Sequence, residues 1–163
     1  MLPGCAVGEM TPLNQIAILN SLLIGLSATS GTILIHGLVV HNIIIEMCRA
    51  LKRGRIGVRI WKNLSFIGGT TLLSLAGHFL EVALWASVFD LCGGVVGFRA
   101  ALYCSAGNYT TVGSGSVGLS PRWKLLGPIE ATAGVLMFGI STALIFAVIQ
   151  RLIQARLDRA EHQ

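Results

Sequence analysis

Three long apolar segments divide this sequence, and each is nearly free of charged residues. They comprise residues 15–48, 64–92 and 125–153. The first basic residue in the chain is Arg49, and the second segment is interrupted only by His78, Glu81 and Asp90. About 20 apolar residues suffice to cross a hydrocarbon core of about 30 Å as a helix. Each segment is therefore predicted to be a membrane-spanning helix.

The composition leads to the same class of protein. Hydrophobic residues make up 53% of the 163 residues and charged residues only 12%, and the mean hydropathy is +0.74. These values exclude an ordinary soluble domain and predict an all-α membrane protein. The sequence has no nucleotide-binding loop, catalytic triad or Cys-x-x-Cys motif. We therefore expect no enzymatic activity and no cofactor.

The distribution of basic residues predicts the orientation. Six of the twelve Lys and Arg residues lie in the loop of residues 49–63: Arg49, Lys52, Arg53, Arg55, Arg59 and Lys62. Cytoplasmic loops carry an excess of Lys and Arg, so residues 1–14 are expected outside and the tail, residues 154–163, in the cytoplasm, across a plasma (inner) membrane. Because spanning segments flank this loop, we expect it to face lipid headgroups rather than nucleic acid.

Residues 93–124 connect the second and third segments. A glycine-rich turn is followed by a predicted short helix over 98–109, with Phe98, Leu102 and Tyr109 along one side. This helix is too short to span a membrane, and the irregular stretch YTTVGSGSVG follows it. Irregular backbone is tolerated inside a membrane only where protein or water surrounds it. We therefore expect a re-entrant loop rather than a free linker.

The stretch Thr110-Thr111-Val112-Gly113-Ser114-Gly115 resembles the TVGYG selectivity filter of tetrameric potassium channels. The resemblance extends over residues 77–152, where the run ALYCSAGNYTTVGSG and the pattern His78-x-x-Glu81-x-x-x-Trp85 are similar to the small bacterial two-pore-domain-like potassium channel family. It implies three transmembrane helices with a re-entrant pore helix and filter loop. It also implies a homotetramer in membrane lipid, through which K⁺ and Na⁺ pass.

The chemistry of such a filter accounts for its residue types. Backbone carbonyls of Thr111, Val112, Gly113 and Ser114 would replace the water around a cation. Successive carbonyls can face one axis only if the backbone alternates in hand, and Gly113 and Gly115 adopt positive φ at little steric cost. Thr110 and Ser116 would flank the filter.

Two positions depart from the family pattern. Family members have Tyr where this chain has Ser114, and usually Asp where it has Ser116. Loss of the aromatic brace behind the filter predicts a reduced preference for K⁺ over Na⁺, unless Phe98, Tyr103 or Tyr109 fills the vacated space. A fully K⁺-selective channel and a non-conducting channel-like subunit are the alternatives.

The remaining polar and glycine positions in the spans have several readings. Close packing between helices is the expected role of Gly134, Gly139, Ser141 and Thr142, and the resemblance makes Gly139 the candidate gating hinge. Glu130 is most simply a partner of the dipole at the start of its helix.

His78 and Glu81 share a helix face, and His36 or His41 of the first span could meet them. An interhelical hydrogen-bond cluster is the expected result. A metal-binding membrane protein with ligands from these four residues is the alternative, although His36 and His41 point about 140° apart on a helix.

Overall fold

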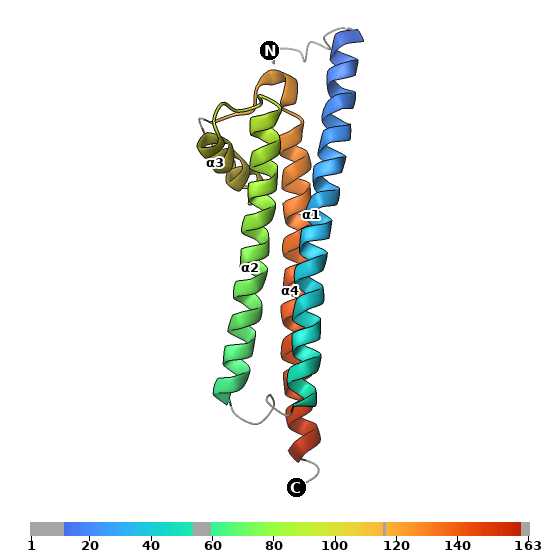
Figure 1. Ribbon diagram of the computed structural model, residues 1–163, viewed down its shortest axis with the longest axis vertical. Coiled ribbons are helices and arrows are strands. Elements are labelled where there is room, and N and C mark those ends of the chain that lie inside the picture. Colours follow the sequence, from blue (N-terminus) through green and yellow to red (C-terminus); the bar gives the residue numbers. More distant parts are fainter. Residues whose placement is uncertain (1–11, 54–59, 116, 161–163) are drawn as a thin grey trace, which may run out of the picture.

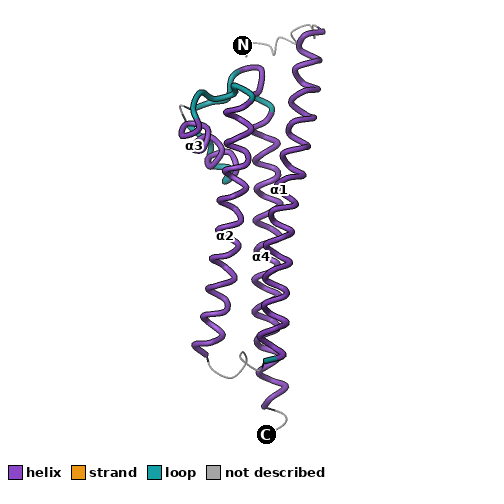
Figure 2. Tube along the Cα trace, in the orientation of Figure 1, coloured by secondary structure: helices purple, strands orange, loops and turns teal. Residues whose placement is uncertain are grey.

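A computed structural model describes residues 12–53, 60–115 and 117–160, and it contains helices and no strand within these ranges (Figure 1 and Figure 2). The elements in chain order are α1 (Pro12–Lys52), α2 (Ile60–Leu91), α3 (Phe98–Tyr109), the 3₁₀ turn η1 (Pro121–Trp123) and α4 (Leu126–Ala160). The prediction of an all-α fold is confirmed. Parts of the expected outer segment 1–14 and of the basic loop 49–63 lie outside the described residues.

The helices α1, α2 and α4 lie side by side, and α1 contacts both of the others (Figure 1). Three stretches within them are long and apolar enough to cross a membrane: Gln15–Lys52, Ile60–Leu91 and Leu126–Asp158. Large apolar side chains point outward along them, as in Leu34 and Phe79, which are 69% and 66% exposed. The chain is therefore a membrane protein with three candidate spans.

Each long helix extends past the apolar segment that predicted it. Helix α1 ends at Lys52, α2 begins at Ile60, and α4 continues to Ala160. Lys and Arg are good helix formers, so a helix does not have to end where the apolar run ends. Hydropathy marks the part of a helix that can lie in lipid, not the whole helix.

The short helix α3 lies beside one end of the α2–α4 pair (Figure 1). A tight turn leads into it, in which the side chain of Asp90 accepts a hydrogen bond from the Gly97 amide at 3.1 Å. Its buried residues are Ala101, Cys104, Ser105 and Tyr109. Of the three side chains expected along one side of this helix, Tyr109 is buried, whereas Phe98 and Leu102 are 48% and 37% exposed.

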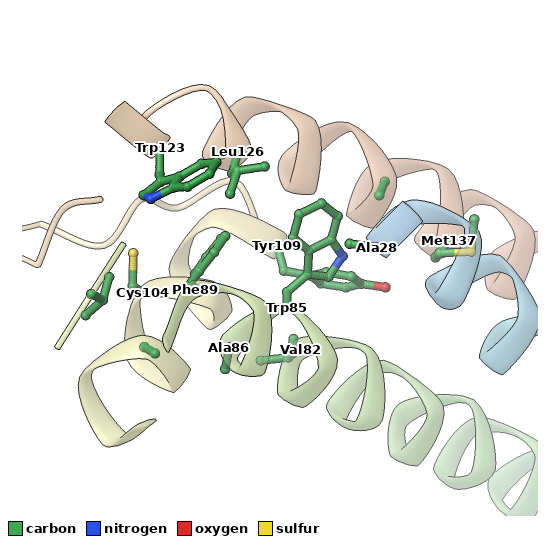
Figure 3. Packing of buried hydrophobic residues seen from close by; sticks show 13 residues of the cluster. Ala28, Val82, Trp85, Ala86, Phe89, Cys104, Tyr109, Trp123, Leu126 and Met137 are labelled. Carbon is green, nitrogen blue, oxygen red and sulfur yellow. The ribbon is translucent and has the colours of Figure 1, made fainter. Parts of the chain in front are cut away.

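Aromatic residues form the main core between α2, α3 and α4 (Figure 3). Trp85, Phe89 and Tyr109 have no exposed surface, and Leu126 and Trp123 cover them from the start of α4 and the turn before it. The Trp85 indole N–H donates to the buried hydroxyl of Thr32 on α1 at 3.0 Å. This core fixes α3 within the bundle.

Candidate ion pathway

The segment that follows α3 has a backbone of alternating hand. Thr111, Gly113 and Gly115 have φ values of 62°, 87° and 59°, whereas Val112 and Ser114 lie outside the positive-φ region. Positive φ at the two glycines agrees with the expectation, because glycine has no β-carbon and adopts positive φ at little steric cost. Positive φ at a threonine is uncommon, and nothing in the sequence predicted it.

Two backbone hydrogen bonds hold this segment against α3. The Thr111 amide donates to the Asn108 carbonyl, and the Gly113 amide donates to the Gly107 carbonyl, both at 2.9 Å. A β-carbon at Gly107 would lie 2.7 Å from the Gly113 carbonyl oxygen. The close approach of the segment to its supporting helix therefore requires glycine at position 107.

The carbonyls of the segment differ in their surroundings. In the described part of the chain, no donor pairs with the carbonyl oxygens of Thr111 and Val112. The Gly113 carbonyl lies against Gly107 of α3, and the Ser114 carbonyl accepts from the Val117 amide at 3.1 Å. The outer side of the segment is open in the single chain, where the Val112 side chain is 84% exposed. Ser116, predicted at the outer mouth, lies outside the described residues.

A hollow of about 390 Å³ lies beside Ser114. It is lined by residues of α3, of residues 111–115 (the filter-like segment), of the loop that follows and of the start of α4, among them Cys104, Asn108, Ser114, Leu119, Gly127 and Ala131. None of the three aromatic residues that could have replaced the missing tyrosine lines it. Phe98 and Tyr103 are 48% and 62% exposed, and Tyr109 contacts Glu81 instead. The Ser114 hydroxyl lies 3.5 Å from the Cys104 sulfur.

The last residue of α3 packs directly on the backbone of α4. A β-carbon at Gly134 would overlap the carbonyl oxygen of Tyr109. Gly134 is thus a close-packing position. At Gly139 a β-carbon would meet no atom within 4 Å, so close packing within the chain does not explain this glycine, and it stays the hinge candidate.

Glu81 is completely buried at the centre of a group of polar side chains. Its carboxyl oxygens lie 2.9 Å from Nδ1 of His36 and 3.3 Å from Nδ1 of His78, and the Tyr109 hydroxyl donates to it. The histidine of the first span that meets Glu81 is His36, whereas His41 is exposed. A hydrogen-bond cluster therefore joins α1, α2 and α3.

His36, His78 and Glu81 also form a possible metal-binding group. One ligand atom from each residue lies within 4.8 Å of the other two. Two imidazoles and a carboxylate are a ligand set that zinc accepts. His41 is not part of this group, so the predicted set of four ligands does not assemble.

Glu130 is not the partner of the helix dipole that its position near the helix start suggested, because the first turn of α4 contains no acidic residue. Its side chain has no exposed surface and pairs with the Ser105 hydroxyl of α3. The same hydroxyl lies 2.9 Å from the Val82 carbonyl. Since Ser105 has one hydroxyl proton, both contacts are hydrogen bonds only if Glu130 donates to Ser105. Glu130 therefore belongs to the contact between α3 and α4, on the same side of α3 as the contact of Tyr109 with Glu81 and one helical turn before it.

The part of the chain that has this geometry is similar to a known family. Residues 77–151 match a family described as ion channels. The matched stretch runs from within α2 through α3 and the filter-like segment to residue 151 of α4, and it excludes α1. No curated protein and no solved structure matches the chain.

The match supports an ion channel, and it does so for the part of the chain that contains the alternating backbone and its supporting helix. It also agrees with the expectation that the protein is a channel rather than an enzyme.

Proposed function

We propose that this protein is a homotetrameric cation channel of the potassium-channel type, similar to the small bacterial two-pore-domain-like family. Residues 111–115 would form its filter, and K⁺ would pass with a reduced preference over Na⁺. The single observation that carries the proposal is the alternation of φ at residues 111, 113 and 115 directly after a short helix. Alternation of this kind is what a row of axial carbonyls requires.

The exposed side of the segment supports an assembly of several copies. Unpaired carbonyls of Thr111 and Val112 cannot face lipid at low cost, and in the single chain the adjacent Val112 side chain is open. Four copies around one axis would enclose this side and give each cation several carbonyl ligands. In such a filter the Gly113 carbonyl would turn from α3 towards the axis.

The proposed orientation puts the N-terminus outside and the C-terminus in the cytoplasm of the plasma (inner) membrane. It follows from the basic residues between the first two spans and from Arg151 and Arg156 near the end of α4. The α3 helix would then enter from the outside, with its C-terminal partial negative charge directed into the membrane, which favours cations.

Oligomeric state is the first test of this proposal. One chain supplies a quarter of a filter, so we expect mass measurement in detergent and in lipid nanodiscs to give four copies per particle. A stable monomer or dimer in both media would contradict the proposal. Tetramers that give no single-channel events under any cation gradient would favour the alternative of a non-conducting subunit.

The reduced selectivity follows from the surroundings of Ser114. Selectivity requires that the carbonyls keep their spacing or their field strength. Among the described residues, no aromatic side chain lines the hollow of about 390 Å³ beside the filter-like segment. The segment is therefore free to relax towards a geometry that admits partly hydrated Na⁺. A fully K⁺-selective channel is the alternative, in which other contacts hold the filter-like segment in place.

We expect the reversal potential of the parent channel in bi-ionic K⁺ and Na⁺ to lie nearer to zero than that of a K⁺-selective channel. Replacement of Ser114 by Tyr together with Ser116 by Asp should move the reversal potential away from zero, because the aromatic ring fills the hollow and four acidic groups return to the outer mouth. The control is Ser114→Thr, which adds only a methyl group. Selectivity already complete in the parent, or a ratio unchanged in the double variant, would refute the reasoning from the missing tyrosine.

The metal-binding alternative rests on one specific observation, the proximity of ligand atoms from His36, His78 and Glu81. It predicts a stoichiometric transition metal in the purified protein that is lost in His36→Ala. Elemental analysis of both proteins decides between a metal site and a hydrogen-bond cluster.

A further inference from the structure

Five side chains from the four α-helices form a closed ring of contacts, which we call the polar ring: His36, Glu81, His78, Tyr109 and Ser141. Besides the contacts of Glu81 described above, Nδ1 of His78 lies 3.0 Å from the Tyr109 hydroxyl. The Ser141 hydroxyl of α4 closes the ring, 3.0 Å from Nε2 of His78 and 3.2 Å from Nε2 of His36.

Counting protons shows how the ring holds together. Its five successive contacts are Glu81–His36, His36–Ser141, Ser141–His78, His78–Tyr109 and Tyr109–Glu81. Tyr109, Ser141 and two neutral imidazoles supply one proton each, which leaves one contact without a proton. If Glu81 or one imidazole carries the missing proton, every contact is a hydrogen bond and the ring as a whole is neutral. A neutral, fully bonded ring avoids the cost of an isolated charge or an unpaired polar group in the membrane.

Ser141 differs from several other hydroxyl residues in the spans. Thr29, Thr70, Ser87 and Thr142 donate to a carbonyl of their own helix, four residues earlier. Such bonds are the ordinary way to satisfy a hydroxyl in a helix. The Ser141 hydroxyl instead lies between two imidazoles of other helices. Ser141 as a residue is 6% exposed. Its placement serves contacts between helices.

The polar ring adjoins the filter-like segment through Tyr109. Tyr109 is the last residue of α3, and Thr110 and Thr111 follow it. Through the ring, the phenol of Tyr109 is tied to α1, to α2 and to α4 at Ser141, close to the hinge candidate Gly139. A movement of α4 at this level would therefore change the hydrogen bonds that hold the end of the supporting helix.

We propose that Ser141 and His36 are positioning residues for ion conduction, which act on the filter through His78, Glu81 and Tyr109. This inference rests on the proposed function, because it assigns to α4 and to α1 a role in holding the filter in its conducting conformation. It also gives α1, which lies outside the match to ion channels, a defined part in the pore.

The test uses the full-length protein in lipid and a double-mutant cycle of Ser141→Ala and Tyr109→Phe. Each variant removes one hydroxyl from the ring. The matched control is Thr142→Ala, which removes a neighbouring hydroxyl that bonds only within α4. Single-channel open probability is one readout, and hydrogen exchange at the amides of residues 105–113 is the other. Exchange does not depend on conduction.

We expect Ser141→Ala to change the open probability by at least about fivefold, the effect of one buried hydrogen bond, and to accelerate exchange at the end of α3. The double variant should show little more than the larger single effect, because both hydroxyls belong to one network. Ser141→Thr should restore the parent behaviour. Thr142→Ala should match the parent in both readouts.

Two results would overturn the inference: Ser141→Ala indistinguishable from Thr142→Ala in exchange, or additive effects of Ser141→Ala and Tyr109→Phe. If the parent tetramer conducts no ions, the proposed channel function fails, and the exchange data alone then decide whether the polar ring positions the segment.

Discussion

Replacing Gly134 by Ala is expected to abolish cation current and to lower the unfolding temperature. The added β-carbon would overlap the Tyr109 carbonyl oxygen, which belongs to backbone and cannot rotate away as the end of a side chain would. Overpacking of this kind costs about 1–3 kcal/mol or more. The strain acts where the supporting helix ends, so α3 must move away from α4 and the filter-like segment must move with it.

Thermal unfolding of the purified protein in detergent is the measurement, and Gly139→Ala is the control on the same helix. At Gly139 a β-carbon meets nothing within 4 Å, and alanine is the better helix former by about 1 kcal/mol. We therefore expect Gly139→Ala to leave the unfolding temperature unchanged or to raise it. Equal unfolding temperatures for the two variants would show that α3 does not rest on Gly134.

Replacing Glu81 by Ala is expected to destabilise the protein by about 3 kcal/mol or more, because removal of one partner from a buried polar group leaves the others unpaired. The imidazole of His36 and the hydroxyl of Tyr109 would both lose a partner in the bundle interior. Glu81→Gln keeps an acceptor and gains a donor, so it should retain most of the stability.

The control for Glu81→Ala is Glu46→Ala. Glu46 pairs with Arg49 at the surface, where the two side chains are 61% and 58% exposed. Exposed ion pairs contribute about 0–1 kcal/mol, so little change is expected. The measurement is the denaturant dependence of unfolding, compared between the two alanine variants and Glu81→Gln. A Glu81→Ala variant as stable as Glu46→Ala would mean that the contacts of Glu81 in the polar ring do not stabilise the fold.

Much of the architecture could be predicted from the sequence because lipid imposes strong rules on it. A run of apolar residues, such as 64–92, can hardly be anything but a spanning helix. Gly113 and Gly115 were expected to adopt positive φ as the glycines of a filter, and positive φ is found at both. Helix spacing placed His78 and Glu81 on one face, and a histidine of the first span does join them.

The contacts between elements could not be predicted, since they depend on how the helices are rotated and how deep α3 lies. Glu130 looked like a helix-start residue, and only its depth against Ser105 makes it a buried partner of α3. Tyr109 was a candidate to fill the space beside Ser114, yet its hydroxyl turns to Glu81. In retrospect, the sequence carried one signal for these contacts. Ser105 and Tyr109 are one helical turn apart, and the hydroxyl of each faces a carboxyl group.

The length of α1 has a mechanical consequence. Its 41 residues make a rod about 60 Å long, twice the thickness of the hydrocarbon core. His36, the point at which this rod is tied to Glu81 and Ser141, lies in its middle part and not at either end. A helix pivoted there is a two-armed lever, and a tilt of about 10° would move its ends by about 4–6 Å while the pivot hardly shifts. A force applied to one end of α1 would thus reach the other end multiplied by the ratio of the two arms, and the pivot at His36 would carry the sum of the two forces.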